Sequence, residues 1–493
     1  MEFNEKQKIA IGMLNDFLKS KDKKFYLFGH AGTGKTFTVS NFLVNSLKEG
    51  TVNKLFICAP THKALNVISS YFKSFICDYP ELADKTSDDI MYMTFQKLLS
   101  YKPIVDGTTG KKVFMAAKES KFLKDLKNKL IVVDECSMIS QDLLKDIDKY
   151  LAQTNTLKII YLGDSAQLPP VEEDISDIFN ETNQTKQCII LDEVMRTDKK
   201  EIFAVYNEVR EWDMKNNLAK NLVNYHGTDK AFRMYHHKDD FIKTTWFKTY
   251  LKDLDAGKVP IILAWRNETV NQYNIIIRQH LYKKENIHET IVGDILVFNN
   301  FYFCSEEIKF YTSDTARVVK TKTKKKTLFD WMTLYIESDT DIDKSYNKFL
   351  KKLSKVPLEF DVEFLTVEKI SSGTQNHGQE GVKGTIRVVS KKDQNLYKNS
   401  LNILETHLDQ FFKIYKSDTH STELWTAFYS SIVDPYADVI YGYSMTTHKS
   451  QSSTFSNVYV DMRDILTNID LREAKCCLYT AATRASNNLA MII

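Results

Sequence analysis

Short apolar runs alternate with longer amphipathic stretches in two separate parts of the chain. In the first part, apolar runs occur at residues 25–29, 55–59, 130–134, 158–163 and 188–191. Apolar runs of this length, joined by helix-like connections, predict buried strands of a parallel sheet that is covered by helices. The second part has apolar runs at 259–265, 458–461 and 489–493 and helix-like stretches at 268–281 and 471–484. The pattern therefore predicts an α/β protein with two parallel sheets.

Two stretches interrupt this alternation. Residues 289–436 contain short β-rich runs and polar turns, and the lysines at 320–326 predict a solvated β-turn. Near residues 100–125, the turn residues at 106–110 separate two apolar pairs, which is typical of a β-hairpin. The expected division is a first domain, a second domain in two segments and an insertion: 1–225 with the hairpin, 226–288 joined to 437–493, and 289–436.

The strongest chemical signal follows the first apolar run. Residues 29–36 read G-H-A-G-T-G-K-T, the G-x-x-x-x-G-K-T pattern of a phosphate-binding P-loop. Glycines let backbone N–H groups face the phosphates, and the following helix adds the positive end of its dipole. Lys35 is expected to reach the β and γ phosphates of ATP, and Thr36 to ligate Mg²⁺. The other ATP-binding candidates in this loop are Gly29, Ala31, Gly32, Thr33 and Gly34.

Two carboxylates end the apolar run at 130–134. Asp134 is expected to hold Mg²⁺, and Glu135 to polarise the water that attacks the γ-phosphate. A solvated strand end would give the same two residues, but the P-loop upstream favours the catalytic interpretation. The pair therefore predicts hydrolysis of the nucleotide as well as binding.

Composition adds only broad limits. The chain has 493 residues and a formal net charge of +3, so it is long enough for several domains and too weakly basic to indicate a nucleic-acid partner. Its apolar runs are far shorter than the ~18 residues that a membrane span needs. The first five residues lack the regions of a signal peptide. The seven cysteines form no C-x-x-C pair, so we expect reduced thiols, without zinc or disulfides, in a cytoplasmic protein.

Further segments occur in a fixed order along the chain. They are N-E-K-Q at 4–7, A-P-T-H-K-A at 59–64, D-E-C-S-M at 134–138, Y-L-G-D-S-A-Q-L-P-P-V at 161–171, L-D-E-V-M-R-T at 191–197, A-W-R-N at 264–267, M-T-T-H-K-S-Q at 445–451 and Y-T-A-A-T-R-A at 479–485. They resemble the Q motif and motifs Ia, II, III, IV, IVa, V and VI of the superfamily 1 helicases, specifically of the RecD-like branch with its Dda-like enzymes. The resemblance implies two RecA-like domains, a β-hairpin pin, and an insertion that combines an SH3-like hook with a helical tower.

The resemblance also implies roles for residues of the nucleotide site. Gln7 would recognise the adenine edge, and Gln167 would sense the γ-phosphate and couple it to the bound strand. Arg196 and Arg484 would stabilise the charge that develops on the transferred phosphoryl group. Taken singly, an arginine is more often a surface charge, and only its place within such a motif favours the catalytic role.

A protein that moves along a strand needs hydroxyls, amides and cations for phosphates, and apolar faces for bases. The candidates for contact with single-stranded DNA are Pro60, Thr61, His62, Lys63, Thr94, Thr447, His448 and Lys449. For any one of them, a helix-capping or solvent-facing role is an equal alternative. The lysines at 320–326 could touch duplex DNA, although the solvated turn is the simpler interpretation.

The hairpin near residues 100–125 lies where the Dda-like enzymes carry their strand-separating pin. Phe114 falls at the place of their wedging aromatic, and Pro103 stands at the base of the hairpin. A phenyl ring there could replace base stacking at the fork. The alternative is that Phe114 packs within a small subdomain.

Two residues depart from the family pattern. Ser452 stands at the glycine position of motif V, which reduces backbone freedom there. Gln96 stands where motif Ib often has histidine, and it keeps hydrogen-bonding capacity without a titratable group.

The sequence as a whole predicts an ATP- and Mg²⁺-dependent DNA helicase that moves 5′ to 3′. Its expected partners are single-stranded DNA, single-strand to duplex junctions and possible replication proteins, with no membrane. We expect it to act as a monomer in the cytoplasm, which is the host cytoplasm if the source is viral. Two alternatives stay open: an RNA-directed helicase, and a nucleotide-switched loading ATPase that binds nucleic acid without processive unwinding.

Overall fold

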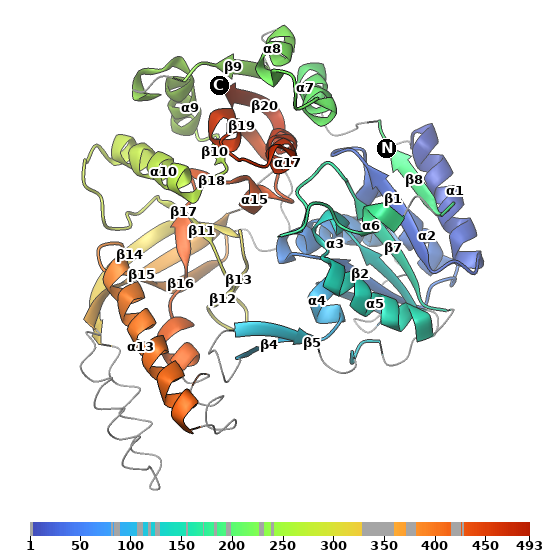
Figure 1. Cartoon of the computed structure of the whole chain (residues 1–493), viewed down its shortest axis with the longest axis horizontal. Helices are drawn as coiled ribbons and strands as arrows, with labels where there is room; N and C mark the ends of the chain where they lie inside the picture. Colours follow the sequence, from blue (N-terminus) through green and yellow to red (C-terminus); the bar gives the residue numbers. More distant parts are fainter. Residues whose placement is uncertain are drawn as a thin grey trace.

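The computed structural model describes the chain except for residues 1–2, 80–81, 83–88, 106–111, 117–119, 124–128, 154–155, 171, 182–184, 194–198, 226–230, 238–240, 328–358, 371–380, 416–424 and 426–427. In Figure 1, two parallel sheets lie at the right and at the top, and an antiparallel sheet lies below the second of them. This arrangement agrees with the predicted α/β class and with two parallel sheets.

The first sheet has six parallel strands in the order β3-β2-β6-β7-β1-β8. The strands are β1 (Lys24–Gly29), β2 (Lys54–Ala59), β3 (Ile90–Thr94), β6 (Lys129–Val133), β7 (Lys158–Gly163) and β8 (Cys188–Leu191). Successive residues of β2 enter different cores: Leu55 and Ile57 pack on one face of the sheet, and Phe56 and Cys58 on the other. Both faces are therefore covered, which explains why the strands read as continuous apolar runs.

Helices cover the two faces of this sheet. Residues of α1 (Glu5–Lys19), α2 (Lys35–Lys48) and α3 (His62–Cys77) share one core with it, and residues of α5 (Gln141–Gln153) share the opposite core. Because β1 and β2 lead directly toward α2 and α3, the loops at 29–34 and 60–61 lie at the same edge of the sheet. The P-loop and motif Ia therefore lie at that edge.

The second sheet has five parallel strands in the order β18-β10-β19-β20-β9. The strands are β9 (Phe232–Tyr235), β10 (Ile261–Ala264), β18 (Ser444–Thr446), β19 (Phe455–Asp461) and β20 (Ala485–Ile492), and the main helices are α9 (Thr245–Asp255), α10 (Asn267–Tyr282) and α17 (Leu471–Ala482). The chain thus contributes to this sheet before and after the insertion, as predicted. Strands β9 and β18, and β3 of the first sheet, were not predicted.

The position of helix α7 (Lys200–Glu211) differs from the expected domain boundary at 225. Its apolar residues Ile202, Val205 and Val209 pack into the core of the second sheet, together with Leu263 and Val458. By packing, α7 therefore belongs with the second sheet. The chain passes to the second domain before residue 200.

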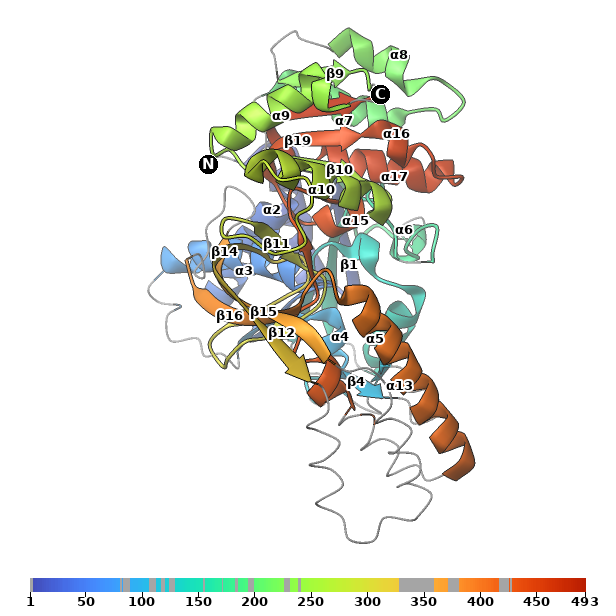
Figure 2. The same ribbon diagram turned by 90° about the vertical axis from the view of Figure 1, so that its left-hand side faces the viewer.

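The insertion contains an antiparallel sheet in the order β16-β15-β14-β11-β17. The strands are β11 (Ile295–Phe298), β14 (Thr315–Thr327), β15 (Glu359–Ile370), β16 (Lys383–Val389) and β17 (Val439–Tyr441); the short strands β12 (Tyr302–Phe303) and β13 (Lys309–Phe310) form a separate pair, and α13 spans Gln394–Tyr415. Figure 2 shows α13 running along the outside of this sheet. One core joins the sheet to the second domain, because Leu296 and Leu365 share it with Ile262.

The prediction of a β-turn at residues 320–326 is wrong. These lysines lie within β14, which pairs with β15 from Lys320 to Thr327. Their side chains are exposed. A long strand that is polar on both faces has no apolar alternation, so the sequence pattern resembled a turn.

The predicted hairpin consists of β4 (Tyr101–Val105) and β5 (Lys112–Ala116). The two strands are antiparallel, and Pro103 pairs with Phe114 across the ladder. In Figure 1 the hairpin extends from the first domain toward the insertion. Among the helices of the described residues, none is both long and apolar enough to cross a bilayer.

Candidate functional site

The P-loop has the conformation that its glycines allow. Gly32 and Gly34 have φ values of +82° and +79°, in the left-handed region that glycine adopts without a steric cost. A Cβ atom on Gly34 would lie 2.7 Å from Nε2 of Gln7, and a Cβ on Gly29 would lie 2.3 Å from the carbonyl oxygen of Leu191. These positions therefore admit only glycine, and α2 begins directly after Gly34.

Gln7 is held against the P-loop. It forms a capping box with Asn4 at the start of α1, and its Nε2 donates to the carbonyl oxygen of Thr33 at 3.1 Å. The side chain is buried. The structure thus brings Gln7 to the nucleotide-binding loop, and its contact with adenine stays a prediction.

The side chains expected to bind phosphate and Mg²⁺ meet at the start of α2. Lys35 donates from Nζ to the carbonyl oxygens of Gly29 and His30, at 2.8 and 3.0 Å. Thr36 donates from Oγ1 to Oδ2 of Asp134 at 2.9 Å. A hydroxyl beside a buried carboxylate fits Mg²⁺, which prefers oxygen ligands. Burial and the neighbouring Glu135 carboxylate raise the pKa of Asp134 to about 6.

Glu135 faces the second domain. Its φ of 53° places it in the left-handed region, and its Oε1 accepts a 3.4 Å hydrogen bond from Oγ of Ser452. Ser452 itself has a φ of 58°. The backbone at the altered motif V position therefore keeps a conformation that glycine favours, and the serine hydroxyl reaches the expected catalytic carboxylate from the other domain.

A hydrogen-bonded group of four residues joins the two domains beside the P-loop. Tyr479, on α17, donates from its hydroxyl to Oδ2 of Asp164 at 2.7 Å and accepts from the backbone N–H of Ala31 at 3.2 Å. Arg210, on α7, donates to the Tyr479 hydroxyl at 3.1 Å and to Oδ1 of Asp164 at 2.6 Å. A phenol has one proton and two acceptor sites, and all three are used. We call Ala31, Asp164, Arg210 and Tyr479 the P-loop interface.

Charge stabilises the P-loop interface. Burial alone would raise the pKa of Asp164, but Lys35 and Arg210 hold this pKa below its usual range. Asp164 therefore stays ionised between two cations. Arg210 was not among the predicted residues: it lies outside the recognised motifs, and its partners are 46 and 269 residues away in the sequence.

Gln167 lies next to this interface. It is buried, and the backbone N–H of the following Leu168 donates to Oγ1 of Thr480 on α17, at 3.3 Å. Motif III therefore contacts the second domain directly. The role of Gln167 as a γ-phosphate sensor stays a prediction.

Arg484 is almost completely buried within the second domain. Its guanidinium donates to the carbonyl oxygens of Thr480 and Ser453, at 3.0 and 3.2 Å, and to Oγ1 of Thr483 at 3.0 Å. To contact a nucleotide, the guanidinium of Arg484 would have to break some of these hydrogen bonds and form new ones to a phosphate. Arg196 lies outside the described residues, so both arginine roles stay predictions.

The expected strand-binding residues lie at the carboxyl ends of β2, β3 and β18. Thr61 and Thr94 cap α3 and α4 (Phe95–Leu98) through their hydroxyls, which accept from Ala64 and Lys97. Pro60, directly before Thr61, is partly exposed. The capping alternative therefore applies to both threonines, and their contact with a strand stays a prediction.

The motif V residues differ in accessibility. Thr447 is completely buried, and its hydroxyl donates to the carbonyl oxygen of Ala264 at 3.4 Å, so its side chain does not reach the surface. Nε2 of His448 lies 3.6 Å from the carboxylate of Glu473, and burial lowers the pKa of this histidine. Lys449 contacts the insertion, as do His62 and Lys63 of motif Ia.

The hairpin presents its aromatic residue to solvent. The Phe114 side chain is 65% exposed, which argues against the alternative of a packing residue. Pro103 pairs with it in the ladder, and the Pro103 side chain lies outside the described part of the structure. The geometry is compatible with a wedge.

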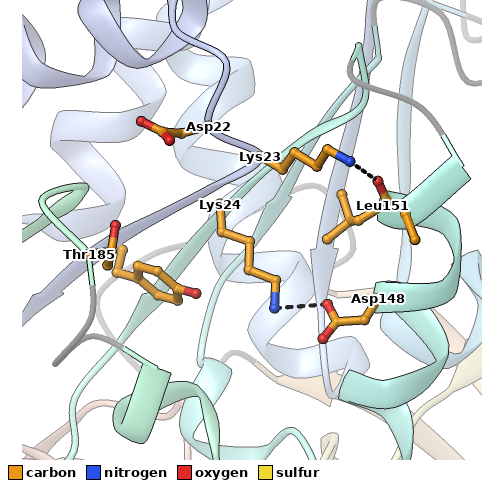
Figure 3. A pocket seen from close by; sticks show the side chains of 8 residues that line it. Asp22, Lys23, Lys24, Asp148, Leu151 and Thr185 are labelled. Atoms are coloured by element: carbon orange, nitrogen blue, oxygen red, sulfur yellow. Dashed lines mark hydrogen bonds and ion pairs between the residues drawn. The ribbon is translucent and has the colours of Figure 1, made fainter.

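A pocket of about 410 Å³ lies at the opposite end of β1 from the P-loop (Figure 3). Its two lysines are already bonded: Lys23 donates to the carbonyl oxygen of Leu151 at 2.6 Å, and Lys24 pairs with Asp148 at 2.8 Å. Because parallel sheets bind ligands at the carboxyl ends of their strands, we do not assign this pocket to the functional site.

Two family models match the chain. Residues 2–228 match an AAA domain, and residues 441–492 match a UvrD-like helicase C-terminal domain. The chain is 40% identical over 498 residues to the uncharacterized protein R530 of Acanthamoeba polyphaga mimivirus, with all of both chains covered. It is 24% identical to the uncharacterized protein MJ1519 of Methanocaldococcus jannaschii, of which it spans 38%.

Solved structures also align with the whole chain. The Pif1 helicase from Bacteroides, in complex with ADP-AlF3 and ssDNA, is 14% identical, with a TM-score of 0.49 and 92% of that chain covered. The Pif1 helicase from Candida albicans is 14% identical, with a TM-score of 0.46 and 95% covered.

Proposed function

The chain belongs to the same family as the mimivirus protein R530, its matched domains are those of a superfamily 1 helicase, and we propose that it is an ATP-dependent DNA helicase. It moves 5′ to 3′ along a single strand and unwinds the duplex ahead. One observation carries this proposal: the hydroxyl of Tyr479, on the second domain, bonds directly to the Ala31 amide of the P-loop. A movement of the P-loop when ATP binds or is hydrolysed would therefore act on a contact between the two domains.

The nucleotide chemistry follows from residues of both domains. P-loop amides and Lys35 bind the phosphates of ATP. Thr36 and Asp134 would hold Mg²⁺, which supplies positive charge beside the phosphates. Glu135 orients the attacking water and takes its proton. Arg196 and Arg484 approach the transferred phosphoryl group when the domains close.

Closure and opening of the domains provide the motion. Lys63 lies on the first domain and Lys449 on the second, and each supplies a cation for a phosphate of the strand. If ATP draws the domains together and hydrolysis releases them, these two contacts alternate in strength and the strand advances. The hairpin with Phe114 then separates the base pairs at the junction.

Direction and substrate come from the resemblance to the RecD-like branch. That branch moves 5′ to 3′ on DNA, and the proposed working form is a monomer on single strands and junctions. Replication proteins are the expected partners. A location in the cytoplasm, or the host cytoplasm for a viral source, is part of the same proposal.

Unwinding of tailed duplexes tests the proposal. Labelled duplexes with a 5′ or a 3′ overhang, carried on a DNA or an RNA loading strand, are mixed with ATP and Mg²⁺. We expect displacement from 5′-tailed DNA only, and Lys35→Ala should abolish it. Displacement from duplexes with a 3′ overhang would contradict the proposed 5′ to 3′ direction. Displacement only from duplexes with an RNA loading strand would contradict the assignment of DNA as the substrate. ATPase activity that single strands do not stimulate, without displacement, would favour the loading ATPase.

A further inference from the structure

A loop of the insertion joins the two motifs that are expected to bind the strand. Lys63 of motif Ia donates from Nζ to the carbonyl oxygen of Ser313 at 3.2 Å. Lys449 of motif V donates from Nζ to Oδ1 of Asn299 at 2.5 Å. Residues 299–313 therefore touch both the first and the second domain at the edge where the motifs lie.

Aromatic rings line this loop. The ring of Tyr311 stacks on His62 of motif Ia, with centroids 4.0 Å apart and planes at 26°. Phe301 packs against Tyr311 at 5.5 Å between centroids. The Phe301 side chain is nevertheless 54% exposed, so one part of it meets Tyr311 and the rest faces solvent. Together, His62, Lys63, Asn299, Phe301, Tyr311 and Lys449 form what we call the insertion face.

An exposed phenyl ring next to two lysines is a combination that suits the binding of single-stranded nucleic acid. A ring of this kind, held from behind by a second ring, offers a flat apolar surface for a base. Lys63 and Lys449 stand on the two sides of the loop and can each meet a phosphate. Asn299 fixes the position of Lys449, because its Oδ1 accepts from that lysine while its Nδ2 donates to Oδ1 of Asp438 at 2.8 Å. Bases alternating with negative phosphates match this combination of a flat ring and two cations. The phosphates would compete for the lysines with the carboxylates of Asp314, which acts on Lys63, and Asp438, which acts on Lys449.

We propose that Phe301 is a stacking platform for a base of single-stranded DNA, with Tyr311 and His62 fixing its position. The inference rests on the proposed function, because it adds a contact to the same strand. The insertion would then help to bind the single strand of DNA between motifs Ia and V. Phe301 lies outside the motifs, so the family pattern gives no role for it.

Binding of single strands to Phe301→Ala and Phe301→Trp tests the proposal. Affinity for a labelled oligodeoxynucleotide is measured by fluorescence anisotropy with the full chain and no nucleotide. Phe301→Ala should weaken binding about five- to a hundredfold, the range for loss of a stacked base. Phe301→Trp should restore it, since an indole also stacks. Ile275→Ala on α10, where the side chain is 53% exposed, is the control and should bind like the unaltered protein.

An abasic oligonucleotide separates stacking from charge. It keeps the phosphates and lacks the bases, so Phe301→Ala and the unaltered protein should bind it equally. Equal affinity of the two proteins for the normal strand overturns the inference. Failure of the unaltered protein to bind any single strand overturns the proposed function instead. Melting temperatures check that the variants are folded.

Discussion

The P-loop interface and the insertion face use their polar groups in opposite ways. At the P-loop interface, the Tyr479 hydroxyl uses its proton and both lone pairs, and Asp164 is paired with Arg210. At the insertion face, an aromatic ring stays half exposed beside two lysines, each of which donates to one oxygen within the described part of the chain. The first surface is complete within the protein. The second offers unused binding capacity to a ligand.

This difference corresponds to two kinds of ligand. A nucleotide is small and fixed in shape, so its site can be built from a short loop and closed by a few directed bonds. A moving strand must be released at each step, so its contacts need to be individually weak and independent of sequence. The two surfaces should therefore respond differently to substitution: large losses at the first, graded losses at the second.

The largest loss is expected for the arginines that complete the nucleotide site. Arg484→Ala should lower DNA-stimulated ATP turnover by ~10³-fold, the low end of arginine-finger effects, with a smaller change in nucleotide affinity. Arg196→Ala should behave alike. Steady-state ATPase assays measure turnover, and Arg472→Ala, an exposed arginine at the start of α17, is the control. Full DNA-stimulated turnover in either variant would show that the arginine is structural.

The next loss is expected at the carboxylate that faces Ser452. Glu135→Gln keeps the size of the side chain but removes the base, so turnover should fall by ~10²-fold or more while ATP still binds. Binding of a fluorescent ATP analogue and ATPase assays check the two halves of this prediction. Lys35→Ala should lose both activities. If Glu135→Gln hydrolyses ATP at the unaltered rate, the assignment of motif II is wrong.

A smaller effect is expected where the two domains meet. Tyr479→Phe removes a hydroxyl bonded to a carboxylate, a contact worth ~1.5 kcal/mol, so DNA-stimulated turnover should fall about tenfold. Tyr250→Phe is a matched control, because the buried Tyr250 hydroxyl on α9 donates to the Tyr443 carbonyl oxygen at 3.1 Å and, within the described part of the chain, contacts no residue of the P-loop interface. ATPase assays and melting temperatures are compared for both. Equal losses of turnover would mean that the hydroxyl contributes only to folding.

The hairpin differs from both surfaces, because we expect it to separate base pairs without binding the single strand along which the protein moves. Phe114→Ala should reduce unwinding about fivefold or more, from the loss of one stacked base, and leave translocation and ATPase on single strands nearly unchanged. Strand displacement, translocation and ATPase assays are run on the same preparation. Parallel losses in all three would instead assign Phe114 to packing, despite its exposure.

How far the sequence predicted these features depends on the separation of the residues involved. The P-loop and the Asp134–Glu135 pair have their chemistry in consecutive residues, and the apolar runs of the two main sheets were long enough to identify. Strand β18 has three residues, too few for a periodic pattern, and β9 is interrupted by Arg233, whereas the equally short β8 and β10 are mostly aliphatic. Strand β3 was also not predicted. The partners of Arg210 are 46 and 269 residues away in the sequence, and Phe301 lies in a loop whose Tyr311 stacks on the distant His62. No local pattern marks Arg210 or Phe301.

The smallest effect is expected from pH at the insertion face. Burial lowers the pKa of Lys63 to about 8, with Arg484 contributing in the same direction and Asp314 opposing it. The lysine is therefore charged below this pH and neutral above it, so its attraction for a phosphate is lost as pH rises through 8. One partly exposed ion contact is worth roughly 0.5–1 kcal/mol, so the dissociation constant for single strands should rise about two- to fivefold between pH 7 and 9.

Lys63→Arg stays charged over this range and should remove that part of the pH dependence. Anisotropy titrations at constant ionic strength measure both profiles, and identical slopes for the two proteins would exclude Lys63 as the titrating group. Because this response involves charge alone, it should persist on abasic strands, where Phe301 has nothing to stack on.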